Sequence, residues 1–327
     1  MNLSALFHRS AVFALIGFGL LAAAPTRAQN ITCTTSMTAV AFATVNPLAS
    51  QTDTNGTLTY NCTNHTGQTR SATLCFSIGE PAGGPTNPRL MHDGAGDTLQ
   101  FQLYQDSAHS VIWGSSFFGS NTPLVVNLTS LPQNSSTGTR QATLYGRVLN
   151  GQTAAIPASY TDNYQSGDTA LTINEVTGNT PPGSCGGTQA GVFFPFLVSA
   201  TVAKQCTVSA TTLDFGTIGL LTANTPGTSQ IGVQCANRSA YSIGLNQGLN
   251  GATINTREMA LGANLIGYQL YSNSPRTVVW GNTVGTNTIA GTGNGSVQNL
   301  TVYGSVPAQT TPAAGTYTDT ITVTVTY

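Results

Sequence analysis

The segment Gly315-Thr316-Tyr317-Thr318-Asp319-Thr320-Ile321-Thr322-Val323-Thr324-Val325-Thr326-Tyr327 shows the pattern that decides the fold. Over its second half apolar side chains alternate with threonines, so that the two kinds fall on opposite faces. A period of two residues is that of a β-strand with one face on a core and the other toward solvent. We therefore predict a strand here, with one apolar face made by Ile321, Val323, Val325 and Tyr327.

The rest of the chain follows the same rule. Short segments alternate apolar residues with Thr or Gln and are separated by Gly, Asn and Pro, which favour turns. No stretch shows a persuasive helical period. Short strands at regular spacing predict an all-β protein, either a sandwich with immunoglobulin-like topology or a barrel.

Two copies of one pattern follow each other along the chain. Cys33 and Cys62 are 29 residues apart, and so are Cys206 and Cys235. Further landmarks recur in the same order in both copies: Phe101-Gln102-Leu103-Tyr104 and Tyr268-Gln269-Leu270-Tyr271, Trp113-Gly114 and Trp280-Gly281, Tyr145-Gly146 and Tyr303-Gly304, Tyr160-Thr161-Asp162 and Tyr317-Thr318-Asp319. This repetition predicts two tandem β-sandwich domains, over residues 29–203 and 204–327. Because Trp113, Trp280, Arg89 and Arg257 recur in both copies, we expect them to have structural roles.

The first residues predict export. An apolar run over residues 11–24 follows Arg9 and ends at the small residues around Ala28. The run is shorter than the ~20 residues that a membrane-spanning helix needs. Residues 1–28 therefore read as a signal peptide that is cleaved before Gln29.

Six cysteines in an exported chain predict three disulfides. Equal spacing favours the pairs Cys33–Cys62 and Cys206–Cys235, which leaves Cys75 and Cys185 for each other. Six cysteines allow fifteen pairings, so this set is a preference. No Cys-x-x-Cys occurs and the histidines lack ligand partners at suitable spacing, so no metal site is expected.

Composition argues against other classes of function. Charged residues make up 6% of the chain, against about 25% in typical soluble proteins. Without a basic stripe, nucleic acid is a poor candidate partner. No nucleophile motif or carboxylate pair stands out, and Asp162 and Asp319 are expected in ordinary turns. We therefore expect no enzyme and no cofactor.

The second copy resembles the spore coat protein U family, whose domains are subunits of archaic chaperone–usher pili. The resemblance rests on Cys206-Thr207-Val208, Leu213-Asp214-Phe215-Gly216, Gly267 to Tyr271, Trp280-Gly281, Val302-Tyr303-Gly304 and Gly315 to Val323. The first copy matches more loosely. The resemblance implies immunoglobulin-like domains that lack their last strand, and donor-strand complementation by another chain. It also implies a periplasmic chaperone, an outer-membrane usher and the next pilin subunit as partners, and export through the periplasm to the cell surface.

Within this family pattern, residues 191–203 resemble a donor strand that completes the first domain in cis. Its inward-facing residues are Val192, Phe194, Phe196, Val198 and Val202. The second domain is expected to lack its final strand, with Ile321, Val323, Val325 and Tyr327 along the edge of the open acceptor groove. After cleavage four residues precede Cys33, and four residues span at most ~14 Å, too little for a donor strand. We therefore expect a subunit that receives a strand but donates none, which places it at the pilus tip.

Insertions suggest where a tip subunit attaches to its target. Trp113 and Tyr145 are 32 residues apart, and Trp280 and Tyr303 are 23 apart, so the first copy is longer here. Loops on a rigid scaffold tolerate insertions and carry binding functions. The family resemblance implies apolar adhesive loops at the distal end of the first domain. The candidates are Val45, Pro47, Leu48, Phe117, Phe118, Ala154, Ala155 and Ile156.

The leading hypothesis is thus a pilus tip adhesin that attaches cells to abiotic or host surfaces and promotes biofilm formation. One alternative is a structural pilin or cap without receptor binding. Another is a secreted carbohydrate-binding protein.

Overall fold

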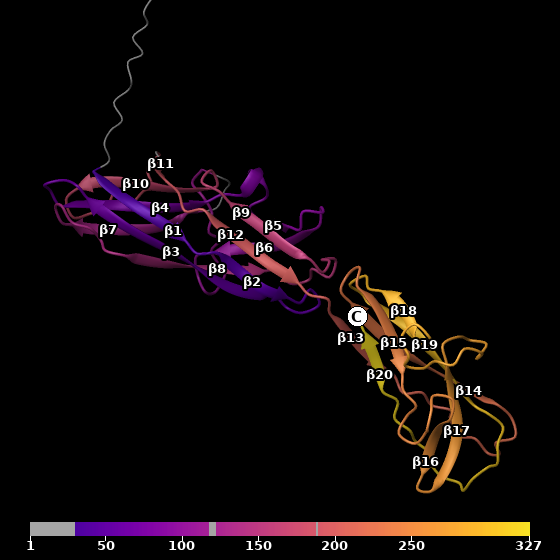
Figure 1. The fold of residues 1–327 in the computed structure, drawn as a ribbon. Coiled ribbons are helices and arrows are strands. Elements are labelled where there is room, and N and C mark those ends of the chain that lie inside the picture. The colour runs from indigo at the N-terminus through magenta and orange to yellow at the C-terminus, as the bar shows by residue number, and fades with distance from the viewer. Residues whose placement is uncertain (1–29, 118–121, 188) are drawn as a thin grey trace, which may run out of the picture.

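The computed structural model describes residues 30–117, 122–187 and 189–327. This part of the chain is built from β-strands, with a single 3-10 turn, η1 (Pro81–Gly83). Figure 1 shows two groups of strands joined end to end where the chain passes from β12 to β13. The predicted signal peptide lies outside the described residues.

The first domain is a sandwich of two sheets. The larger sheet has the order β1-β3-β8-β6-β5-β9-β12-β2, and the smaller one has the order β11-β10-β4-β7. The bounds of these strands are β1 (Ile31–Met37), β2 (Val40–Val45), β3 (Thr52–Asn64), β4 (Arg70–Ile78), β5 (Arg89–His92), β6 (Thr98–Tyr104), β7 (Leu124–Leu131), β8 (Arg140–Val148), β9 (Ser159–Tyr164), β10 (Thr169–Thr177), β11 (Gln189–Val192) and β12 (Phe196–Val202).

The second domain repeats this plan with fewer strands. Its sheets have the orders β13-β14-β19-β17-β16 and β18-β15-β20. The bounds are β13 (Cys206–Ala210), β14 (Thr225–Cys235), β15 (Ala240–Leu245), β16 (Arg257–Leu261), β17 (Asn264–Tyr271), β18 (Ile289–Thr292), β19 (Val297–Val306) and β20 (Val323–Thr326). The predicted C-terminal strand is thus present, although it is shorter than the alternating segment suggested.

Each domain has its own hydrophobic core. One cluster of buried residues runs from Ile31 to Val202, and the other runs from Cys206 to Val306. Three disulfides reinforce them, namely Cys33–Cys62, Cys75–Cys185 and Cys206–Cys235. These are the pairs that the equal spacing favoured. The first and third join directly paired residues at the start of each domain, on β1–β3 and β13–β14.

The repeated tryptophans and arginines lie inside the cores. Trp113 and Trp280 are fully buried, and their indole N–H groups donate to the carbonyls of Phe76 and Ile243 at 2.8 and 2.9 Å. Arg89 and Arg257 are also fully buried. Each donates from Nη2 to the carbonyl of its domain's tryptophan. A guanidinium with several donors thereby satisfies carbonyls that the sheets leave unpaired.

Candidate functional site

Strand β12 lies next to the edge strand β2 of the first domain's larger sheet and is paired on both sides. It runs antiparallel to β9 and parallel to β2, with Val198 opposite both Asp162 and Val40. Four of its side chains point into the core and are at most 5% exposed, namely Phe196, Val198, Ala200 and Val202. Phe196 also stacks on Tyr164, with ring centroids 4.5 Å apart. The segment is therefore paired along both of its edges, with β9 on one side and β2 on the other.

The segment before β12 changes sheet at Pro195. β11 pairs with β10 of the smaller sheet, whereas β12 belongs to the larger one. A proline has no N–H to donate to a ladder, which ends the pairing between the two strands. Phe194 is fully buried at this crossing, and its N–H donates to Thr169 Oγ1 at 3.0 Å. The predicted single strand over residues 191–203 is therefore two strands, and Val192 is half-buried on the first of them.

In the first domain β12 lies between β2 and β9. The second domain has segments equivalent to both of these neighbours. A Cβ on Gly146 would meet Val40 and Phe42, and one on Gly304 would meet Leu213 and Phe215, so these pairs correspond. On the other side, Thr161 bridges His92, and Thr318 bridges Ala260 in the same way. The tyrosine hydroxyls also correspond, because Tyr160 and Tyr317 donate to the carbonyl four residues before each of them.

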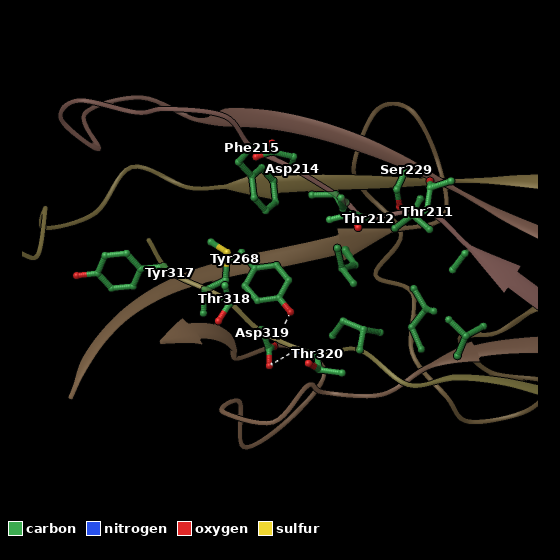
Figure 2. Close-up of a pocket in the computed structure, with 18 of the residues that line it drawn as sticks. Thr211, Thr212, Asp214, Phe215, Ser229, Tyr268, Tyr317, Thr318, Asp319 and Thr320 are labelled. Atoms are coloured by element: carbon green, nitrogen blue, oxygen red, sulfur yellow. Dashed lines mark hydrogen bonds between the residues drawn. The ribbon is translucent and has the colours of Figure 1, made fainter. Parts of the chain in front are cut away.

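Between these two neighbours the second domain has an open groove instead of a strand. The groove encloses about 500 Å³ and is lined from one side by Leu213 and Phe215 and from the other by residues 316–321. Figure 2 shows these two walls, with Asp319 in the second wall and Tyr268 between the two. Val40 and Phe42 are buried, whereas Leu213 and Phe215 are only half-buried. Among the described strands, none of the second domain occupies the position of β12.

One wall of the groove presents free backbone groups. Thr318 and Ala260 exchange N–H···O bonds of 2.9 and 3.2 Å. Successive residues of a strand direct their backbone groups to opposite sides, so the N–H and C=O of Tyr317 and Asp319 face the groove. In the first domain the corresponding residues, Tyr160 and Asp162, pair with Ala200 and Val198 of β12. This wall can therefore bind a further strand.

A polar pair joins Tyr268 to Asp319 in the wall of the groove. Tyr268 Oη donates to Asp319 Oδ2 at 2.6 Å, and Asp319 Oδ1 accepts the N–H of Leu249 at 2.8 Å. Burial and the bond to Asp319 raise the pKa of Tyr268 well above its ordinary value. Burial lowers the pKa of the nearby Arg257 to about 10. The Asp319 carboxylate thus has hydrogen-bond partners within its own domain.

The places of the two repeated aspartates were not foreseen. Asp162 and Asp319 were expected in turns, but Asp162 lies within β9, 7% exposed, and Asp319 lies in the wall of the groove. Their repetition in both copies was the available signal. Alternation with Tyr160 and Tyr164 places Asp162 on the core face, where an aspartate is unusual.

The expected groove-edge residues divide into two groups. Ile321 and Val323 line the groove, whereas Val325 and Tyr327 do not. Val323 and Val325 belong to β20, which pairs with β15 in the other sheet. Tyr327 lies beyond the strand and is 47% exposed. The edge that faces the groove is therefore Tyr317–Asp319, several residues before the predicted one.

Most of the candidate adhesive residues lie at the wrong end of the first domain. The N–H of Ala203, where the chain leaves for the second domain, donates to the carbonyl of Val45. Asn237 of the second domain donates to the carbonyl of Ala154 at 2.8 Å. The predicted distal placement is thus incorrect for these two loops, because β2 and β8 run toward the second domain and end beside it. The residues concerned are Val45, Pro47, Leu48, Ala154, Ala155 and Ile156.

Of the two adjacent phenylalanines, Phe117 and Phe118, the structure describes only Phe117. Phe117 is half-buried, and its N–H donates to Ser115 Oγ at 2.9 Å. Phe118 lies outside the described residues. The adjoining Ser116 N–H donates to Ser77 Oγ near the end of β4. This hydrogen bond places Ser116, next to Phe117, beside the last residues of β4.

The described residues offer no candidate metal site and no candidate membrane-spanning helix. No group of three or more His, Cys, Asp or Glu side chains there is arranged to hold a metal ion. No helix in that part of the chain is long and apolar enough to cross a membrane.

Comparisons with known proteins agree on one family. A family model, the Spore Coat Protein U domain, matches residues 19–166 and 192–324. Protein U of Myxococcus xanthus is 33% identical over 145 residues, which cover 39% of this chain and 80% of that protein.

A solved structure has a similar fold. It is a pre-assembly complex of a chaperone and a tip adhesion subunit from the archaic chaperone-usher Csu pili of Acinetobacter baumannii. The match has a TM-score of 0.55 and covers 90% of this chain and 100% of that one. At 18% identity the likeness concerns the fold alone.

Proposed function

The chain belongs to the Spore Coat Protein U domain family, and we propose that it is the adhesive tip subunit of an archaic chaperone–usher pilus. In this role the second domain binds a strand from another polypeptide, and the first domain attaches to a surface. The matched segments cover most of both domains.

The observation that carries the proposal is the contrast between the two domains. In the first domain β12 lies between β9 and β2, and its apolar side chains complete the core. In the second domain the same two walls enclose an open groove. An unpaired strand edge beside an apolar groove favours association with another chain. A strand with alternate apolar residues can pair with the backbone of the edge and fill the groove with its side chains.

The tip position follows from the use of the donor segment. Residues 189–202 carry the alternating apolar side chains of a donor strand, and they are bound within their own chain. The disulfide Cys75–Cys185 also fixes the chain shortly before this segment to β4. A subunit whose donor segment is bound internally can receive a strand without giving one. Such a subunit is suited to the first place in a fibre.

The partners follow from this mechanism. A periplasmic chaperone would cover the groove until the outer-membrane usher exchanges it for the donor strand of the next pilin subunit. The exported chain would then reach the cell surface at the end of the pilus. There it would attach cells to abiotic or host surfaces and promote biofilm formation. No step of this process requires catalysis by the chain.

Thermal unfolding of the signal-free chain tests the groove. We would add a peptide with the sequence of residues 191–203 and follow the unfolding of each domain. Binding to the folded state alone stabilises by about 2.7 kcal/mol at a ligand concentration of 100 Kd. We expect the transition of the second domain to rise and that of the first, which already holds β12, to stay.

Two altered peptides serve as matched controls. Val198 is fully buried in β12 and Leu197 is 40% exposed. A peptide with V198D should therefore lose the effect, while one with L197D should keep it. If the unaltered peptide leaves the second domain unchanged, the proposed strand-binding role is wrong.

A further inference from the structure

A second pocket lies at the end of the first domain remote from the second domain. It encloses about 430 Å³, within the range of roughly 300–1,000 Å³ that is usual for small-molecule sites. Its walls come from β7 and the chain that follows it, and from β3 and β8 on the opposite sheet. In Figure 1 the β7 label lies at the end of the molecule away from the second domain.

Three loops meet at this end of the domain. The N–H of Asn64 donates to the carbonyl of Ser135, and the N–H of Asn134 donates to that of Thr66. Gly178 in turn donates to the carbonyl of Thr69. If the chain is a tip subunit, as proposed above, this is the end that meets a target.

Residues special to the first domain build the pocket. β7 has eight residues, whereas its counterpart β18 has four. The connection to the next strand spans residues 132–139 in the first domain and 293–296 in the second. Most of the extra length between Trp113 and Tyr145 therefore lies here, rather than beside Phe117. The elongated β7 and its connection supply the pocket residues from Val126 to Thr137.

The pocket offers polar groups that the fold leaves free. The Tyr60 ring packs on Phe76, with centroids 5.2 Å apart. Its hydroxyl makes no hydrogen bond within the described residues, although Tyr60 lines the pocket. Exposed Asn127 and Thr129 lie along the wall formed by β7. Asn127 Oδ1 accepts a bond from Thr73 Oγ1 at 3.2 Å, which leaves the Nδ2 group of Asn127 as a donor. Ser130 has φ 55°, a strained backbone of the kind that gathers at binding sites.

Arg140 gives the pocket its charge. Three of the four arginines in the first domain pair with a carboxylate, namely Arg70 with Glu175, Arg89 with Glu80 and Arg147 with Asp53. Arg140 has no carboxylate partner among the described residues. Its Nε donates to the carbonyl of Thr137 at 3.2 Å, which leaves both terminal nitrogens free. Arg140 is exposed and lies opposite Tyr60 across β8 and β3.

The surrounding loops are uncharged. Segments 65–69, 132–139 and 178–187 contain no Asp, Glu, Lys or Arg. A single unpaired guanidinium among hydroxyl and amide groups fits a ligand with one acidic group and many hydroxyls, because guanidinium binds carboxylate bidentately. We propose that this pocket binds an acidic saccharide, with its carboxylate on Arg140 and its hydroxyls against Tyr60, Asn127 and Thr129. The saccharide is thus the target of the proposed adhesin.

Calorimetric titration of the signal-free chain tests this assignment. The probes are a trimer of galacturonate and its methyl ester, which has the same ring and no charge. We expect the acid to bind and the ester to bind at least tenfold more weakly. R140Q should weaken acid binding about tenfold or more, since a hydrogen bond to a charged group is lost. Y60F should weaken it by a smaller factor.

R238Q is the control for the loss of one positive charge, because Arg238 belongs to the second domain, pairs with Asp97 and does not line the pocket, so its loss should change acid binding less than twofold. Equal binding of acid and ester, or equal binding by R140Q and the unaltered chain, would overturn the proposal, as would no binding of the acid. Sulfated dextran bound equally by all variants would show general charge attraction and overturn it as well. The peptide experiment on the second domain is independent of these results, so either proposal can fail alone.

Discussion

Two equivalent arginines are accommodated differently in the two cores. Arg257 donates to carbonyls and to Gln269 Oε1 at 2.8 Å, with no carboxylate in the set. Arg89 also meets the carboxylate of Glu80, which in turn accepts a bond from Tyr164 Oη at 3.1 Å. The first domain therefore holds a buried ion pair where the second holds a cation bound by neutral groups. A buried pair is sensitive to the protonation of its acid.

The charge of Glu80 makes the first domain sensitive to pH. Burial raises the pKa of Glu80 to about 7 and that of the neighbouring Asp162 to about 6. Both folded values exceed the unfolded ones, so the folded state holds protons that the unfolded state has released. This stabilisation is complete below about pH 4 and is lost as the pH rises through 6 and 7. We expect the first domain to unfold at a lower temperature at pH 8 than at pH 5.

E80Q should flatten this pH dependence, because the amide carries no charge at either pH. The expected difference is on the order of 2 kcal/mol between the two pH values in the unaltered chain. E258Q, on β16 of the second domain, serves as the control and should leave the dependence of the first domain intact. Calorimetry at the two pH values is the measurement. An unchanged slope in E80Q would show that other groups carry the effect.

At the level of the element, β12 is the strand on which the first domain depends. Val198 is fully buried between Asp162 and Val40, and Leu197 on the outer face is 40% exposed. In the full chain V198D should cost about 4 kcal/mol or more, because a second carboxylate enters an apolar site beside Asp162. V198A should cost about 2 kcal/mol, and L197D much less.

Thermal unfolding of the three variants checks this expectation. The transition of the second domain should stay the same in each, because its core shares no buried residue with the first. If V198D does not fold, V198A still gives an unfolding transition that can be compared with that of L197D. A loss of stability that is equal for V198A and L197D would mean that β12 does not form part of the core.

The sequence predicted the alternating strands well and the ends of the domains poorly. The strand pattern depends on the local alternation of apolar and polar residues, which can be read from the sequence. The repeated landmarks can be read by comparing the two copies. The end at which a loop lies depends on the direction of its strand, and periodicity carries no information on direction. Val45 and Ala154 were therefore assigned to the wrong end. Pro195 marked the break between β11 and β12, but only the pairing with β10 shows that the chain changes sheet there.

The groove itself was predictable only in part. The lack of a final strand followed from the family resemblance, and the apolar face of Ile321 and Val323 was visible in the sequence. The location of the free edge at Tyr317–Asp319 was not, because it depends on the bridge from Thr318 to Ala260. The polar pocket beside Arg140 was also missed. The extra residues between Trp113 and Tyr145 were counted correctly. Assigning most of them to β7 and the connection after it requires the strand bounds.

For the whole molecule, the two domains form opposite ends of one assembly unit. The strand-binding groove belongs to the second domain, and the chain enters the first domain at Ile31, opposite Asn64 at the remote end. A donor strand placed before Ile31 would therefore extend away from the groove of its own chain. This geometry favours head-to-tail contact between copies, and such heterologous contacts form open fibres when they do not close into rings.

We therefore predict that one added segment turns this subunit into one that polymerises. A copy of residues 191–203 joined by a short flexible linker before Asn30 should give fibres, because each chain can then donate as well as receive. The unaltered chain should stay monomeric at the same concentration. An extension carrying V198D is the matched control, since it keeps the length and loses the apolar side chain that fills the core.

Electron microscopy and size-exclusion chromatography distinguish the outcomes. Monomers from the extended chain, under conditions where the free peptide stabilises the second domain, would mean that the far end of one copy cannot reach the groove of the next.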